Sequence, residues 1–147
     1  MEIISSIDVD VKSAFERLGL TEKGEVQIYA SNKAAQMMEK YVPFAYGSGS
    51  HLRSSVDIQP DYVEYQTPYA HYIYEGELYV DPETGSAWAR KGTTKVPTGI
   101  PLSYHEPGTG PHWDRLMMTA EGSDFNRAVR NKVKEMDSRW MILEHNL

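Results

Sequence analysis

A chain of 147 residues with 40% hydrophobic and 24% charged side chains has the size and composition of one ordinary globular domain, and we expect residues 1–147 to form one. The net charge of −6 argues against a dedicated nucleic-acid binder, because phosphate contacts need Lys and Arg gathered on one face. The sequence has no cysteine, so disulfides and thiolate chemistry are excluded. No apolar run approaches the ~20 residues that cross a bilayer, so we expect a soluble protein.

The first part of the chain predicts two helices. Asp8 can cap a short amphipathic helix, and Gly19 stands where a left-handed stop belongs. A second helix is predicted from Thr21 to Tyr41, because apolar residues recur there at helical spacing and Pro43 ends the pattern. The expected apolar stripe of this second helix consists of Val26, Ala30, Ala34, Met37, Met38 and Tyr41.

The pattern changes after the Gly47–Ser50 segment, which predicts a loop. Residues 51–58 and 62–67 are rich in Val, Ile, Tyr and Ser and are separated by a proline-containing turn, so they predict two antiparallel strands. Tyr69–Glu75 predicts a short helix closed by Gly76.

A second hairpin is predicted over Leu78–Arg90, with its turn in the Asp-Pro-Glu-Thr-Gly segment. In this register Val80 opposes Ala87. Glu77 then opposes Arg90, which is a favourable cross-strand pair of opposite charges.

The remaining chain predicts a long loop and two helices. Gly92–Gly110 is rich in proline and predicts an irregular loop of a length that is uncommon in compact domains. His112–Ala120 predicts a helix, and Ser123 can cap a longer one. Apolar residues spaced 4, 4, 3 and 4 apart mark the longer helix: Phe125, Val129, Val133, Met136 and Trp140.

Together these elements predict an α+β fold. A small antiparallel β-sheet is flanked by N- and C-terminal helices, each of which covers the sheet with its apolar stripe. The Leu78–Gly110 region forms a long hairpin and loop insertion in this arrangement.

Candidate catalytic or metal-binding groups are few. Four side chains close in sequence offer imidazole and carboxylate groups: His105, Glu106, His112 and Asp114. Their spacing matches no known metal motif, so we interpret the histidines as surface or capping residues and predict no metal and no cofactor. His71 and Glu75 share a face of the short helix, but an acid–base role would need a converging pocket. We therefore predict no catalytic residue.

Charges and tyrosines are unevenly distributed. Seven acids and no Lys or Arg lie between Asp57 and Glu83, whereas Arg90, Lys91 and Lys95 follow without an intervening acid. Either these groups neutralise each other within one subunit, or an acidic surface meets a neighbour's basic loop. Six tyrosines lie in the same acidic stretch, where they serve the core or an interface.

Three segments carry a resemblance to a known family. The first is Tyr41–Phe44 followed by Gly49–Ser55, the second is Tyr65–Ala70 continuing to Tyr74–Gly76, and the third is Pro107–Arg115 before a long helix. In this order they resemble the minor capsid proteins of long-tailed bacteriophages, which belong with head–tail joining and tail-completion proteins. The resemblance spans roughly residues 41–135.

The resemblance implies a small α+β subunit, without catalytic residues or cofactor, in a ring at the neck of the virion. It implies as partners further copies of the chain and portal, connector or tail proteins, with DNA passing nearby unbound, and assembly in the host cytoplasm. Because such rings form on the particle, we predict a monomer or weak oligomer in isolation. Our candidate interface residues are Arg53, Tyr72, Glu77, Trp88, Arg90 and Lys91.

Two other classes remain open on the sequence alone. One is a bacterial interaction or adaptor module outside any particle. The other is a small metal-dependent hydrolase or nuclease that uses the four imidazole and carboxylate side chains between residues 105 and 114.

Overall fold

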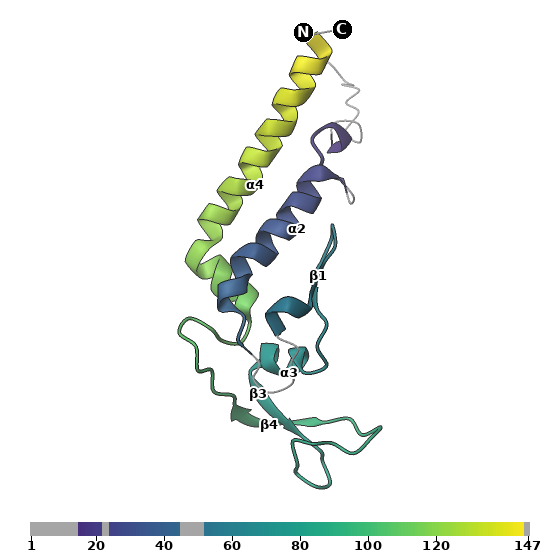
Figure 1. Cartoon of the computed structure of the whole chain (residues 1–147), viewed down its shortest axis with the longest axis vertical. Helices are drawn as coiled ribbons and strands as arrows, with labels where there is room; N and C mark the ends of the chain where they lie inside the picture. The colour runs from purple at the N-terminus through teal and green to yellow at the C-terminus, as the bar shows by residue number, and fades with distance from the viewer. Residues whose placement is uncertain (1–14, 22–23, 45–51, 146–147) are drawn as a thin grey trace, which may run out of the picture.

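The computed structural model describes residues 15–21, 24–44 and 52–145. Its long axis is formed by two helices, and two small β-hairpins lie beside and below them (Figure 1). Most of the helix predicted after Asp8 and the predicted loop at Gly47–Ser50 lie outside the described residues. Residues 15–17 are helical and are followed by a turn that includes Gly19.

Helix α2 (Glu25–Met38) confirms the predicted second helix, and a 3-10 turn (Glu39–Tyr41) continues it to the predicted end. The helix begins after Gly24 and not at Thr21. Its buried side chains, listed in order, are Val26, Ser31, Ala35 and Met38.

Helix α4 (Trp113–His145) runs antiparallel to α2 and extends beyond it at the upper end (Figure 1). The two predicted C-terminal helices are joined end to end, and the break between them is a kink at Glu121 (φ −134°, ψ 15°), two residues before Ser123. Lys132 forms a 3.0 Å ion pair with Glu25 at the start of α2.

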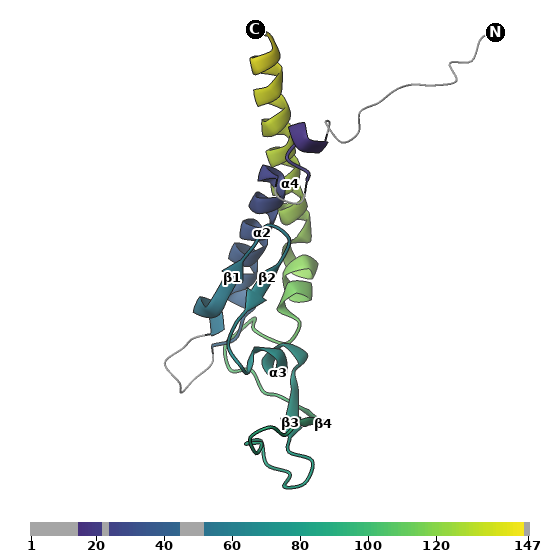
Figure 2. The ribbon, with the colours of Figure 1, turned by 90° about the vertical axis from the view of Figure 1, so that its right-hand side faces the viewer.

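The first predicted hairpin is confirmed. Strand β1 (Val56–Ile58) pairs antiparallel with β2 (Val63–Tyr65), and Asp57 opposes Glu64. Both strands are shorter than predicted, and Leu52–Ser55, predicted as part of the first strand, forms a 3-10 turn. The hairpin lies alongside α2 (Figure 2), where the Ser31 hydroxyl donates a 2.6 Å hydrogen bond to the carbonyl of Pro60 in the hairpin turn.

The second hairpin differs from the prediction. Helix α3 (Ala70–Glu75) ends at Gly76 as predicted, and β3 (Glu77–Val80) follows it. The partner of β3 is β4 (Val96–Pro101), which lies in the stretch predicted as an irregular loop.

The register of this second pair overturns both predicted cross-strand contacts. Val80 opposes Val96 and not Ala87, and Glu77 opposes Pro101 and not Arg90. Residues 81–95 thus form the connection between the two strands, at the lower end of the molecule (Figure 1).

The core lies where α2, α3 and the first turns of α4 meet. Its buried members are Met38, Val42, Leu52, Ala70, Trp113 and Met117. The apolar stripe predicted for the longer C-terminal helix is only partly buried, and Trp140 is exposed. The fold is therefore α+β as predicted, with two separate two-stranded sheets in place of one between the helices.

Candidate assembly surface

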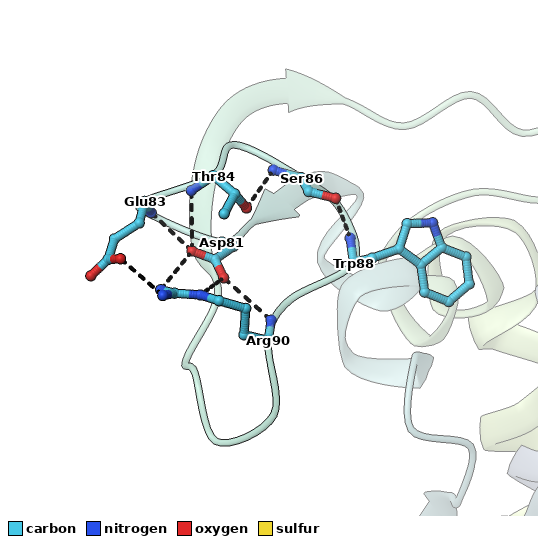
Figure 3. Close-up of polar contacts among 6 residues, drawn as sticks. All are labelled: Asp81, Glu83, Thr84, Ser86, Trp88 and Arg90. Carbon is cyan, nitrogen blue, oxygen red and sulfur yellow. Dashed lines mark hydrogen bonds and ion pairs between the residues drawn. The ribbon is translucent and has the colours of Figure 1, made fainter.

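The connection between β3 and β4 is organised around the carboxylate of Asp81, which is fully buried. Oδ1 accepts hydrogen bonds from the backbone N–H groups of Glu83 (2.9 Å) and Thr84 (3.3 Å). Oδ2 accepts from the backbone N–H of Arg90 (3.3 Å) and from its guanidinium Nε (2.9 Å), as Figure 3 shows. One carboxylate thereby closes a loop of ten residues, 81–90, that has few apolar groups to bury.

The Arg90 side chain links the Asp81 carboxylate to a second acid of the loop. Its guanidinium lies between Asp81 and Glu83, with a 2.9 Å ion pair to the Glu83 carboxylate. The Arg90 guanidinium and the backbone N–H groups hold the pKa of Asp81 well below its usual range. Asp81 therefore stays ionised, and its bonds to the loop persist at every pH at which the protein would normally be handled.

Trp88 is presented by this closed loop to solvent, with 90% of its surface exposed. Its backbone N–H donates to the Ser86 hydroxyl (3.1 Å), and the Ser86 N–H donates to the Thr84 hydroxyl (3.3 Å). The indole points away from the Asp81–Arg90 cluster (Figure 3). Lys91, three residues later, is exposed and has no ion pair with any residue in the described part of the chain.

An aromatic cluster supports the base of the loop. The rings of Tyr72 on α3 and Tyr79 on β3 lie 4.9 Å apart, and the Lys95 ammonium lies 4.8 Å from the centre of the Tyr72 ring. Lys95 is thereby drawn onto the Tyr72 ring by a cation–π contact. Tyr72 is half-buried, and its contact with Tyr79 joins α3 to the hairpin.

The other two candidate residues have local roles. The Glu77 carboxylate accepts a hydrogen bond from the backbone N–H of Gly99, within the β3–β4 hairpin. Arg53, on the 3-10 turn, donates from Nε to the carbonyl of Val42 (2.7 Å), and its guanidinium stacks 4.4 Å from the centre of the Phe44 ring. The structure therefore brings Tyr72, Trp88, Arg90 and Lys91 toward one end of the molecule, on or beside the hairpin that contains Glu77, whereas Arg53 serves the core region.

A pocket of about 410 Å³ lies between β2, α3 and the first turn of α4. We call it the Trp113 pocket, and its main lining side chains are Met38, Val63, Glu64, Tyr65, Tyr74 and Trp113. Tyr65 packs edge-on against Trp113 with 5.2 Å between the ring centres, and burial raises the pKa of Tyr65 to about 12. The pocket is thus an aromatic hollow with two acids in its lining: Glu64, which is exposed, and Asp114, which accepts the hydrogen bond of the Tyr74 hydroxyl.

The groups considered as metal ligands do not converge. Within residues 15–21, 24–44 and 52–145, no cluster of three or more His, Asp or Glu side chains could hold a metal ion. Asp114 accepts a 2.8 Å hydrogen bond from the Tyr74 hydroxyl, and the His112 ring packs on Tyr74 with 4.8 Å between centres. His71 and Glu75 are both exposed on α3.

The sequence analysis placed Asp81 in a turn and did not predict that its carboxylate holds the loop 81–90 closed. The Asp-Pro-Glu-Thr-Gly segment did contain a usable signal, since an Asp side chain commonly accepts backbone N–H groups two and three residues later. The capture of Arg90 by the same carboxylate has no such local signature.

Comparison with known proteins gives the class of the molecule. Residues 5–99 match a family described as minor capsid protein, a class of structural virion proteins and not of enzymes. The match extends over more than half of the chain, which therefore belongs to the minor capsid protein family and is a minor capsid protein of a phage. No curated protein and no solved structure matches the chain. In the described residues, no helix has the length and apolar character needed to cross a membrane.

Proposed function

We propose that this minor capsid protein is a subunit of the neck, where it forms part of a ring that joins head and tail. The proposal rests on one observation above all: the chain carries two different surfaces of opposite charge. A closed ring of identical subunits requires such a heterologous contact, in which one patch of each copy meets a different patch of the next.

The acidic surface lies on the β1–β2 hairpin. Asp57, Asp61 and Glu64 lie there on strands and turn, and Asp61 and Glu64 are exposed. None of the three has an ion pair with a residue of the described ranges; Asp57 accepts a hydrogen bond from the Gln59 amide instead. Their charge is thus available to a partner.

The basic surface lies on the loop between β3 and β4. Part of the sequence-level charge separation is neutralised within the subunit, since Arg90 is held by Asp81 and Glu83. Lys91 and Lys95 remain as the cations of the loop without an acidic partner in the described part of the chain. In Figure 1 this loop and the acidic hairpin occupy different regions of the molecule.

A minor component of a capsid is one present in few copies per particle, and a position at the neck agrees with such a low copy number. A tail attaches at one vertex of the head, so a single ring there needs few subunits. The resemblance of the segments at residues 41–55, 65–76 and 107–115 to head–tail joining proteins supports the same position. The partners are then further copies of the chain and the portal, connector or tail proteins, and the net charge of −6 weakens the attraction of the ring for the passing DNA.

The test is to locate and count the protein in purified particles. Quantitative mass spectrometry gives the copies per particle, and an antibody or gold label gives the position by electron microscopy. We expect a small symmetric number of copies, all at the head–tail junction. Copies distributed over the head shell, or absence from the particle, would overturn the neck assignment.

A further inference from the structure

Trp88 has the properties of a binding anchor. Tryptophan is enriched among the residues that dominate binding energies at protein interfaces, and an anchor costs least when it is already held in position. Here the bonds of the Asp81 carboxylate fix the loop, and the indole is 90% exposed. The chain therefore offers a large apolar side chain on an ordered support, at the end of an elongated molecule (Figures 1 and 3).

The same chain offers a receptor for such a side chain. The Trp113 pocket has about 410 Å³, within the range of about 300–1,000 Å³ that is usual for ligand pockets, and its walls include Met38, Tyr65 and Trp113. All of its lining residues belong to the described part of the chain. An indole fits this volume and would replace water on aromatic walls, which favour edge-to-face contacts.

Charge selects the partner of the loop. Lys91 follows Trp88 by three residues and is exposed, and Glu64, which is also exposed, lines the Trp113 pocket. Glu64 has no ion pair among the described residues, whereas Arg90 is already engaged by Asp81 and Glu83. When Trp88 approaches the pocket, it therefore brings the Lys91 ammonium toward the Glu64 carboxylate, and neither group has an ion pair within the described ranges.

We propose that Trp88 of one copy inserts into the Trp113 pocket of the next copy, with Lys91 beside Glu64. This inference rests on the proposed ring and specifies the contact that closes it. Rotation about a ring axis keeps heights constant, so Trp88 and the Trp113 pocket must lie at the same height along that axis. Because the loop lies at the lower end of the molecule and the pocket lies above it, the long axis of each subunit must be tilted from the ring axis.

The first experiment compares Trp88→Ala with Trp140→Ala, a matched tryptophan on α4 that is 41% exposed. Trp88→Ala is expected to lower self-association of the purified protein at least about tenfold and to reduce its incorporation into particles, because an anchor is lost. Its melting temperature should stay that of the wild type, since Trp88 packs on little in the isolated subunit. Trp140→Ala should leave self-association unchanged. Wild-type association and incorporation of Trp88→Ala would overturn the proposal.

The second experiment exchanges charges. Lys91→Glu and Glu64→Lys should each weaken self-association, and the double variant should recover most of the loss, because the pair is restored with its signs reversed. Both side chains are exposed, so neither change threatens the fold. Two independent losses without recovery in the double variant would show that these residues do not meet.

The third experiment uses the absence of cysteine from the sequence. A chain with Lys91→Cys and Glu64→Cys should form disulfide-linked ladders of copies under mild oxidation, both in particles and in concentrated solution. Each single variant, and Lys91→Cys combined with Asp124→Cys on the exposed face of α4, should not form ladders. A crosslink to another virion protein in place of a second copy would overturn the assignment of the partner.

These outcomes separate the contact from the proposed function. If the wild-type chain is found at the neck while the Trp88, charge and cysteine variants show no effect, the ring assignment stands and the contact is wrong. If the chain is absent from the neck, the function is wrong, and ladder formation in concentrated solution still decides whether the contact exists.

Discussion

The Tyr41 hydroxyl donates a 2.6 Å hydrogen bond to the carboxylate of Glu121, the residue at which α4 departs from helical backbone geometry. The same carboxylate forms a 2.8 Å ion pair with Lys40. The end of the α2 segment thus holds the kink of α4, 80 residues further along the chain. The two long helices are tied together at this point as well as at Glu25, near their other end.

Replacing Glu121 by Gln should produce a pH-dependent loss of stability. The Lys40 ammonium, followed by the Tyr41 hydroxyl, lowers the pKa of Glu121 in the folded protein from its usual 4.5. A lowered pKa means that the stabilisation is complete above the unfolded value and is lost as the pH falls through the folded value. We therefore expect Glu121→Gln to be less stable than the wild type at neutral pH and the difference to shrink below about pH 4.5.

Urea unfolding of the wild type and of Glu121→Gln between pH 7 and pH 3 measures the difference in their free energies of unfolding. The other titrating groups are common to both proteins, so their contributions cancel in this difference. Asp124→Asn is the control, because Asp124 is exposed and its one ion pair among the residues that the structure describes is with its helical neighbour Arg127 (3.2 Å). It should change stability little at any pH. A Glu121→Gln deficit that is the same at pH 3 and pH 7 would contradict the ion-pair account.

Replacing Asp81 by Asn should open the loop that presents Trp88. The amide lacks the charge that holds the Arg90 guanidinium and three backbone N–H groups. Trypsin should then cleave after Arg90 and Lys91 several-fold faster, and the backbone amides of Glu83 and Thr84 should exchange faster with deuterium. Glu83→Gln, which removes only the exposed partner of Arg90, should have a small effect.

The same loop should remain closed in mild acid. Because Arg90 and the backbone N–H groups lower the pKa of Asp81 in the closed loop, its stabilisation is complete above the ordinary Asp pKa of 3.8 and is lost progressively as the pH falls from there through the lowered pKa. Amide exchange at Thr84, corrected for the intrinsic pH dependence, should therefore show constant protection between pH 7 and pH 4. Loss of protection at pH 5 would be inconsistent with an ionised, well-bonded Asp81.

Truncating Leu52 should destabilise the protein strongly. Leu52 is completely buried in the core cluster with Val42, Trp113 and Met117. Leu52→Ala is expected to lower the free energy of unfolding by about 2–5 kcal/mol, through lost burial and a residual cavity. Leu143→Ala, on the 63% exposed end of α4, should change it by no more than about 0.5 kcal/mol. Chemical denaturation measures both, and equal effects would contradict the assigned core.

Substituting alanine for Gly76 should cost more than the same change at Gly85. Both residues have a positive φ, 78° and 68°, so both substitutions strain the backbone by about 1–2 kcal/mol at most. A Cβ at Gly76 would also lie 2.6 Å from the Cβ of Pro111, whereas a Cβ at Gly85 would meet nothing within 4 Å. Thermal unfolding should therefore show a clearly larger loss for Gly76→Ala, and equal losses would indicate that Pro111 does not pack against this turn.

Local patterns in the sequence were sufficient for the helices and for the first hairpin. Residues that share a helix face recur every three or four positions, so the stripe from Val26 to Met38 predicts α2 without any knowledge of its partner. Gly76 marks the end of α3 for a similar reason, since few residues other than glycine adopt its left-handed backbone. The head–tail family resemblance also rested on the sequence, and the family comparison confirms its minor capsid part.

The partner of β3 could not be predicted in this way. Pro97 and Pro101 make the sequence of β4 look unlike a strand. Proline cannot donate a hydrogen bond to a neighbouring strand and normally argues against a strand. Both prolines lie on an exposed strand in a two-stranded sheet, where a missing donor on the outer edge costs little. Pairing also depends on where the connecting loop brings the chain back, which no short window of sequence records.

The sequence by itself thus determined the class of fold, the two long helices and the family, because each depends on patterns along the chain that are visible without the tertiary structure. The tertiary structure alone decided that Asp81 captures Arg90, that Glu121 receives Tyr41 and Lys40, and that Trp88 is left to the solvent. These contacts join side chains whose distance in space is set by the packing of whole elements. A carboxylate and its cation can pair only after the backbone has placed both, so the proposed assembly surface becomes visible only in the folded chain.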